Sequence, residues 1–168
     1  MPIHLVIANQ TLTSEELRLE IARRIENGPV RFYVVVPATP IPHALVWEER
    51  ESMQAARQRL EAIVGWMRER GAEADGEIGD RDPVAAAHDA LRRQPADEII
   101  LSTLPAGRSR WIRQDVPTRL RRTVALPMTV ITPTRNPAEA AMGLSSPGDS
   151  SEAAMGQNSL GDSAQPPA

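Results

Sequence analysis

The sequence predicts a three-layer α/β fold, in which a parallel five-stranded sheet carries helices on both of its faces. Short apolar runs alternate with amphipathic helical patterns along the first 132 residues, and this alternation is typical of parallel sheets. The apolar runs are nearly continuous, as in strands that are buried on both faces. Right-handed crossovers are expected to connect them. The predicted class is therefore a doubly wound, Rossmann-like sandwich.

Five strands and four main helices follow from these patterns. We expect strands over residues 3–8, 31–36, 73–78, 98–102 and 128–132. We expect helices over residues 13–27, 46–70, 84–94 and 115–123. The third strand alternates with charged residues, which indicates an edge position in the sheet.

Turn and capping residues mark the boundaries of the helices. Thr13 and Glu16 have the spacing of a capping box at the start of the first helix. Asp82 is suited to cap the third helix, with Pro83 in its first position. Asp115 is suited to cap the last helix. Residues 103–114 between the fourth strand and this helix contain Pro, Gly and Arg, and we expect them to form a loop.

The composition excludes several kinds of chemistry. The chain has 168 residues, no cysteine, three histidines and no lysine, because all 19 basic residues are arginine. Disulfides, thiolate zinc sites, cysteine nucleophiles and lysine Schiff bases are therefore excluded. No apolar run approaches the ~20 residues of a membrane span, and the first residues lack the basic region of a signal peptide. We expect a cytoplasmic protein.

The charge is unevenly distributed along the chain. Residues 133–168 carry a net charge of −3, equal to that of the whole chain, so residues 1–132 are neutral. The absence of net charge over residues 1–132 argues against nucleic acid as a partner. Residues 134–168 are rich in Ala, Gly, Ser and Pro and show no periodicity, so we expect a disordered tail after a domain over residues 1–133. Residues 138–142 could form a single helical turn.

The C-terminal part of the predicted domain resembles the universal stress protein family. The segments that resemble the family are the strand EIILS at residues 98–102, the glycine-containing loop after it, the helix VPTRLRR at residues 116–122 and the turn LPM before the last strand. The resemblance implies a sheet in the order 3-2-1-4-5, of the adenine nucleotide alpha hydrolase-like type. It also implies a non-enzymatic role in stress response through partners or oligomers, with a homodimer formed along the strand from Met128 to Thr132.

The sequence departs from this family at the nucleotide site. ATP-binding members carry the motif G-x2-G-x9-G-[ST] after the fourth strand, where glycines let backbone amides approach phosphates. When the family's last helix is aligned to begin at Val116, the four motif positions hold Leu101, Leu104, Gln114 and Asp115. None of these residues matches the motif. We therefore predict no cofactor and do not transfer the ATP site, although ATP or AMP binding is not excluded by the motif alone.

A site for a small phosphorylated ligand is the alternative function. Ligands of doubly wound sheets bind at the carboxyl ends of the strands, where the loops over residues 8–12 and 103–110 would face each other. Arginine side chains can hold a phosphate there in bidentate fashion. The candidate residues are Asn9, Gln10, Ser102, Thr103, Gly107, Arg108, Ser109 and Arg110. Equally, Arg108 and Arg110 could be solvated or paired with acidic residues.

The remaining polar residues give no catalytic or metal site. His43 lies on the ligand-binding edge but has no serine or aspartate partner by sequence. His4 and His88 fit structural positions in a strand and a helix. Asp80 and Asp82 resemble a carboxylate pair, but an N-cap explains Asp82. The sequence thus favours a protein without enzymatic activity.

Overall fold

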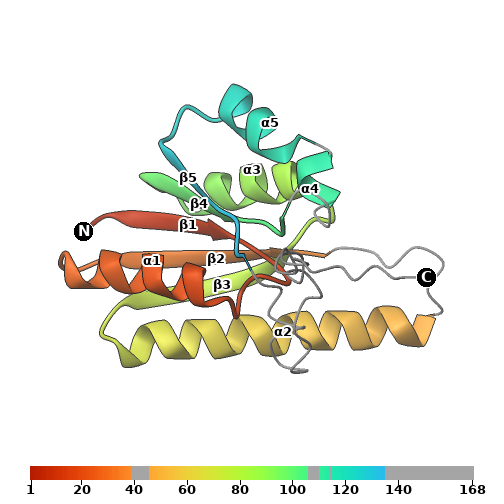
Figure 1. Cartoon of the computed structure of the whole chain (residues 1–168), viewed down its shortest axis with the longest axis horizontal. Coiled ribbons are helices and arrows are strands. Elements are labelled where there is room, and N and C mark those ends of the chain that lie inside the picture. The colour runs from red at the N-terminus through yellow and green to blue at the C-terminus, as the bar shows by residue number, and fades with distance from the viewer. Residues whose placement is uncertain (39–45, 106–109, 114, 135–168) are drawn as a thin grey trace, which may run out of the picture.

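The centre of the molecule is one parallel sheet with the order β3-β2-β1-β4-β5 (Figure 1). The computed structural model describes residues 1–38, 46–105, 110–113 and 115–134, and of residues 46–49, 110 and 113 it describes only the backbone. The strands are β1 (Ile3–Ile7), β2 (Arg31–Pro37), β3 (Glu73–Gly79), β4 (Glu98–Ser102) and β5 (Met128–Ile131). The predicted fold class and strand order are confirmed, and each strand lies within one residue of its predicted bounds.

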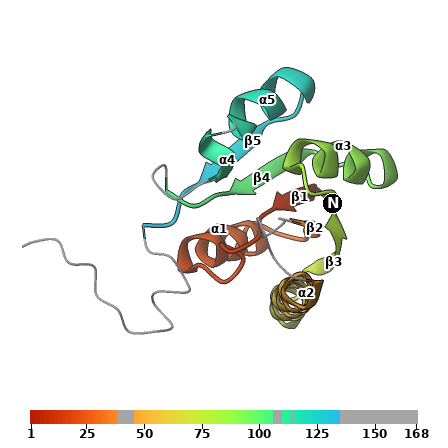
Figure 2. The same ribbon diagram turned by 90° about the vertical axis from the view of Figure 1, so that its right-hand side faces the viewer.

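Helices cover both faces of this sheet (Figure 2). The described helices are α1 (Glu15–Glu26), α2 (Val46–Glu69), α3 (Pro83–Arg93), α4 (Arg110–Arg113) and α5 (Val116–Thr123). Helices α1 and α2 pack on one face, and α3, α4 and α5 pack on the other. Among the described residues, no helix combines the length and the apolar composition that crossing a membrane requires.

The central strand β1 joins two hydrophobic cores. Leu5 and Ile7 face α3 and α5, whereas Val6 faces α1 and α2, and all three side chains are fully buried. This explains why β1 reads as a continuous apolar run rather than an alternating one. The outer strand β3 instead carries Glu73 and Asp75 and lies at the edge, as its polarity predicted.

Three local predictions need correction. The cap of α1 is Ser14, whose hydroxyl accepts from the amide of Leu17, because residues 11–14 form a turn that leaves Thr13 outside the cap position. Asp115 makes no side-chain cap and has a left-handed backbone with φ of 53°. The predicted loop over residues 103–114 contains α4, and the amide of Asp115 bonds back to the carbonyl of Ile112 as the chain turns into α5.

The expected tail lies outside the described residues, except for its first member. Pro133 is still buried, and Thr134 donates from its amide and its hydroxyl to Oε1 of Glu16, both at 3.0 Å. Glu16 thus serves this contact with Thr134 instead of the predicted capping box. The predicted helical turn at residues 138–142 also lies outside the described residues.

Replacing Gly76 in β3 by alanine should destabilise the fold. An added Cβ would lie 2.5 Å from the carbonyl oxygen of Val34 and 2.7 Å from Cδ1 of Leu60, so β3 or α2 would have to shift. We expect Gly76→Ala to lower the free energy of unfolding by about 1–3 kcal/mol in urea denaturation. Gly65→Ala in α2 is the control, because nothing lies within 4 Å of its Cβ. That variant should gain about 0.5–1 kcal/mol, and equal stability of the two variants would contradict the close α2–β3 approach.

Candidate functional site

Two loops meet at the carboxyl edge of the sheet, between β1 and β4. These strands are hydrogen-bonded neighbours, and the strand order reverses at this point. Thr11 Oγ1 donates a buried hydrogen bond of 3.1 Å to the carbonyl oxygen of Ser102. The loop after β1 thus contacts the end of β4 directly. This is the place at which doubly wound sheets bind their ligands.

The described candidate residues connect this point to the neighbouring strands. Asn9 Nδ2 donates to the carbonyl of Pro37 at the end of β2, at 2.9 Å. The amide of Thr103 donates to the carbonyl of Ile131 at the end of β5, also at 2.9 Å. Gln10 is exposed at the edge itself. Along the carboxyl edge, each strand end in the order β2-β1-β4-β5 is therefore joined to the next one.

Three buried residues with hydroxyl groups lie after β1 and at the end of β4. Thr11 and Thr103 are each 2% exposed, and Ser102 is completely buried. Within the described part of the chain, Ser102 Oγ has no hydrogen-bond partner. A buried hydroxyl normally finds a partner, so Ser102 Oγ is an exception at this edge of the sheet. Sequence analysis placed Thr11 in the facing loop but did not select it.

The arginine-bearing half of the predicted site is not placed by the structure. Gly107, Arg108 and Ser109 lie outside the described residues, as does His43. Arg110 begins α4, but its side chain is also outside the description. The hypothesis that these arginines hold an anion therefore stays a prediction.

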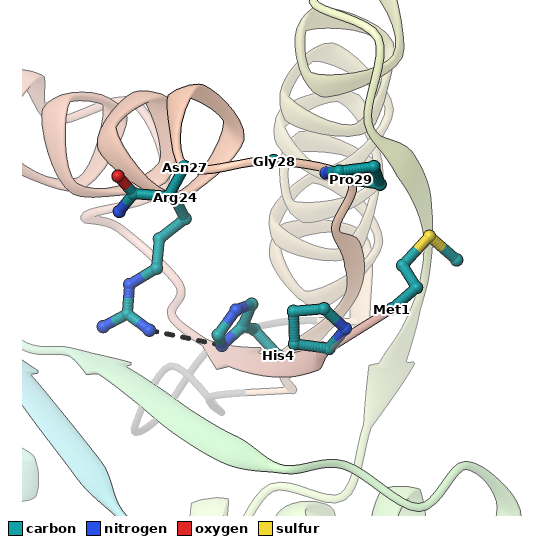
Figure 3. A pocket seen from close by; sticks show the side chains of 7 residues that line it. Met1, His4, Arg24, Asn27, Gly28 and Pro29 are labelled. Atoms are coloured by element: carbon teal, nitrogen blue, oxygen red, sulfur yellow. Dashed lines mark hydrogen bonds between the residues drawn. The ribbon is translucent and has the colours of Figure 1, made fainter.

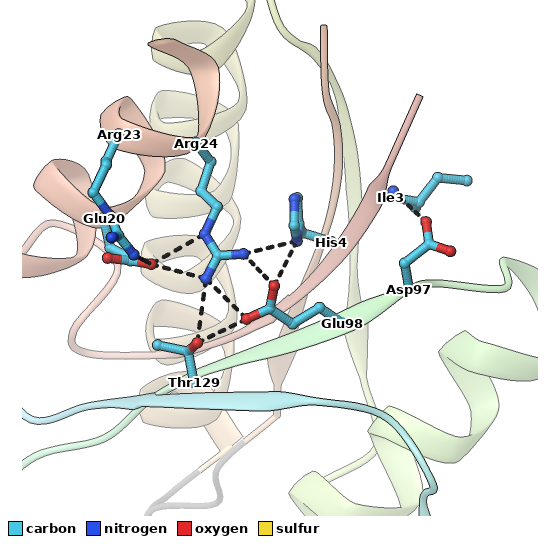
Figure 4. Close-up of polar contacts among 8 residues, drawn as sticks. All are labelled: Ile3, His4, Glu20, Arg23, Arg24, Asp97, Glu98 and Thr129. Atoms are coloured by element: carbon cyan, nitrogen blue, oxygen red, sulfur yellow. Dashed lines mark hydrogen bonds and ion pairs between the residues drawn. The ribbon is translucent and has the colours of Figure 1, made fainter. Parts of the chain in front are cut away.

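A second polar cluster lies at the opposite, amino edge of the sheet, and sequence analysis did not identify it (Figure 4). Arg24 on α1 is the centre of this cluster and is only 14% exposed. Its Nη2 lies 2.8 Å from Oε1 of Glu20 and 2.8 Å from Oε1 of Glu98. Thr129 at the start of β5 donates to Glu98 at 2.7 Å and accepts from Arg24 at 3.2 Å. The cluster ties α1, β4 and β5 together.

The charges in this cluster stabilise one another. Hydrogen bonds from Arg24 hold the pKa of Glu98 below its ordinary value, and Glu98 in turn raises the pKa of Arg24. Burial acts to raise the pKa of Glu20, but hydrogen bonds from Arg23 and Arg24 leave it lowered. Both carboxylates are therefore ionised at neutral pH, and Arg24 balances them.

His4 joins the cluster from β1 and borders an open pocket (Figure 3). Its pKa is lowered first by burial and then by the charge of Arg24, which favours the neutral ring. The pocket has a volume of about 590 Å³. Its lining residues are Met1, Pro2, His4, Arg24, Asn27, Gly28 and Pro29.

The amino-edge cluster could be recognised in part from the sequence. His4 interrupts the apolar run of β1, and Glu98 opens the apolar run of β4, so each is a polar residue in a buried strand. Arg24 lies three residues after Ile21 and seven after Leu17, on the buried face of α1, whereas Arg23 does not. The sequence does not show which carboxylates Arg24 contacts. Within the described residues, no group of three His, Cys, Asp or Glu side chains is placed to hold a metal ion.

The sheet order and the helices on both faces define a doubly wound, Rossmann-like α/β protein. No protein-family model matches the chain, and no curated protein matches it. Solved structures with this fold do match, at sequence identities that establish the fold alone.

Several of the similar structures are described as universal stress proteins. A family protein from Burkholderia pseudomallei is 17% identical with a TM-score of 0.52, covering 77% of this chain and 95% of that one. The universal stress protein from Archaeoglobus fulgidus in complex with dAMP is 19% identical with a TM-score of 0.51, covering 78% and 97%. An Arabidopsis thaliana family protein with AMP bound is 15% identical with a TM-score of 0.53, covering 80% and 93%. The chain has the fold of these proteins, as the resemblance implied.

Removing Arg24 should destabilise the protein far more than removing its neighbour. Arg24→Met leaves Glu20 and Glu98, each 17% exposed, without their shared counter-charge. We expect a loss of about 1–3 kcal/mol in the free energy of unfolding at neutral pH, less than for a fully buried pair. Arg23→Met is the control, because Arg23 contacts Glu20 but is 65% exposed, and it should cost under about 0.5 kcal/mol. Similar losses in the two variants would show that the cluster is not a unit.

Proposed function

We propose that this chain is a divergent protein of the universal stress protein type that acts in the cytoplasm by binding rather than by catalysis. Its stress role would be exerted through a second copy of itself or through another protein. The shared fold supports this proposal. The observation that carries it is a chemical difference between the two edges of the sheet.

The β5 edge is suited to pair with another strand, whereas the β3 edge is not. The outer strand β5 consists of Met128, Thr129, Val130 and Ile131, all half-buried and uncharged. The opposite edge strand β3 carries three carboxylates, on Glu73, Asp75 and Glu77. Charged side chains on an edge strand oppose pairing, and their absence leaves the backbone of β5 open to it. We therefore propose that β5 forms the homodimer contact.

Light scattering after size-exclusion chromatography tests this interface. At micromolar concentration the protein should elute with the mass of two chains. Met128→Lys places a charge on the β5 edge and should give monomers. Asp75→Lys on the β3 edge is the matched control and should remain dimeric, and circular dichroism checks that both variants are folded. A monomeric parent protein, or two equally dimeric variants, would rule out this contact.

Binding of a small phosphorylated ligand at the carboxyl edge is the second candidate function. The observation that favours it is the buried hydroxyl of Ser102, which has no hydrogen-bond partner among the described residues, beside the buried Thr11 and Thr103. Two of the similar structures hold AMP or dAMP. We propose a nucleotide as the ligand, with Asn9 and Gln10 at one side of the site. Arg108 and Arg110 would neutralise its phosphate.

A thermal-shift screen with AMP, cyclic AMP and ATP tests this second function. A ligand at 100 times its Kd should add about 2.7 kcal/mol of stability. The double variant Arg108→Ala with Arg110→Ala should lose this shift, and Ser102→Ala should weaken it several-fold, as the loss of one hydrogen bond of about 1 kcal/mol does. Thr123→Ala, whose hydroxyl contacts His88 far from this edge, is the control. No shift with any nucleotide, or a shift that the double variant keeps, would remove the hypothesis.

A further inference from the structure

The imidazole of His4 lies between a cation and an anion at the amino edge. The ring is 7% exposed and packs against the ring of Phe32, with centroids 5.5 Å apart. Its Nδ1 lies 3.3 Å from Nη1 of Arg24 and 3.4 Å from Oε2 of Glu98. Nη1 of Arg24 also donates to the same Oε2 of Glu98. Three polar groups thus meet at one point (Figure 4).

These contacts require two different protonation states of the ring. A guanidinium can only donate, so the contact with Arg24 requires an Nδ1 without a proton. The contact with Glu98 is a hydrogen bond only when Nδ1 carries a proton. In the neutral state that burial favours, Arg24 donates to Nδ1 and the ring proton lies on Nε2. The contact with Glu98 is then unused.

Protonation of the ring reverses this choice. Nδ1–H and Nη1–H become two donors 3.3 Å apart, and both are directed toward Oε2 of Glu98. Arg24 then loses its bond to His4 and shares its acceptor on Glu98 with a second cation. Arg24 and Glu98 also form hydrogen bonds with Thr129, so a shift of either side chain weakens the contacts at the start of β5.

We propose that His4 is a proton-operated switch, whose protonation loosens the C-terminal turn of α1 and the start of β5 from the sheet. The pocket beside the ring gives protons and water a route from solvent to His4 (Figure 3). It also gives the ring and the end of α1 space in which to move. The proposal does not depend on the function of either the β5 edge or the carboxyl edge.

His4 is the group of this cluster whose ordinary pKa lies in the mildly acidic range. The charged groups that face it are Arg24 and Glu20 from α1, and Glu98 and Asp97 from β4 and the residue before it. Phe32 from β2 and Thr129 from β5 carry no charge. Arginine stays protonated, and the lowered pKa values of Glu20 and Glu98 keep these two carboxylates ionised at mildly acidic pH.

The sign of the effect on stability follows from the lowered pKa of His4. The folded protein binds this proton less readily than the unfolded chain does. The stability that neutral His4 contributes is therefore fully present above pH 6.5 and is lost as the pH falls below it. The same protonation that loosens the cluster thus also lowers the free energy of unfolding.

Hydrogen exchange at two pH values tests the switch on the full chain. Protection factors corrected for intrinsic exchange are compared near pH 7 and near pH 5, for amides at residues 23–28 and in β5. We expect about a fivefold or larger loss of protection there in the parent protein, a typical size for coupling between sites. His4→Asn can still accept from Arg24 but cannot titrate, so it should keep its protection. His88→Asn removes a histidine outside the cluster and should behave as the parent does.

If His4→Asn fails to fold, titration of His4 by NMR in the parent protein tests the switch instead. At neutral pH we expect the Nδ1 chemical shift of a neutral ring that carries its proton on Nε2. We expect the pKa of this ring to lie below 6.5. Titration at or above 6.5 would overturn the proposal. So would an equal pH response in the parent and in His4→Asn, or a loss of protection spread evenly over the whole sheet.

Discussion

Burial of β1 on both faces is the constraint on which the rest of the structure depends. Leu5, Val6 and Ile7 have no exposed surface, and an unpaired polar group among them would cost several kcal/mol. Polar chemistry is therefore confined to the two ends of the strand. At one end Thr11 reaches Ser102, and at the other end His4 reaches Glu98. The two candidate sites are separated by the apolar middle of the same two strands.

The order of elements could be predicted because each depends on local patterns. Continuous apolar runs identified the strands, and the polarity of β3 identified its edge position. The caps were predicted less well: Ser14 rather than Thr13 caps α1, because a turn over residues 11–14 decides which residue is extended. The loop facing β4 was predicted too, yet Thr11 was not selected from it. Its role depends on reaching the carbonyl of Ser102, 91 residues away.

The amino-edge cluster was missed for a different reason. Arg24 contacts Glu98 and Thr129, which lie 74 and 105 residues further along the chain. Such pairings appear only after the sheet has been assembled. The sequence could have shown His4 and Glu98 as polar residues in apolar strands. It could also have shown Arg24 as the arginine on the buried face of α1, seven residues after Leu17, but not that these residues meet. A buried strand that begins with a charged residue implies a partner for it.

Helix α1 connects the two ends of the edge strand. Its first turn holds Thr134 through Glu16, just after β5, and its last turns hold Thr129 through Arg24, at the start of β5. Hydrogen bonds from Thr134, mainly from its backbone amide, lower the pKa of Glu16, so that its carboxylate stays ionised at mildly acidic pH. A proton on His4 would therefore release α1 at one end only. The carboxyl edge, fixed by Glu16 and by the bond between Thr11 and Ser102, would keep its geometry while the amino edge loosens. Ligand binding and acid response would then be separate properties of one domain, and a variant at either end could alter one without the other.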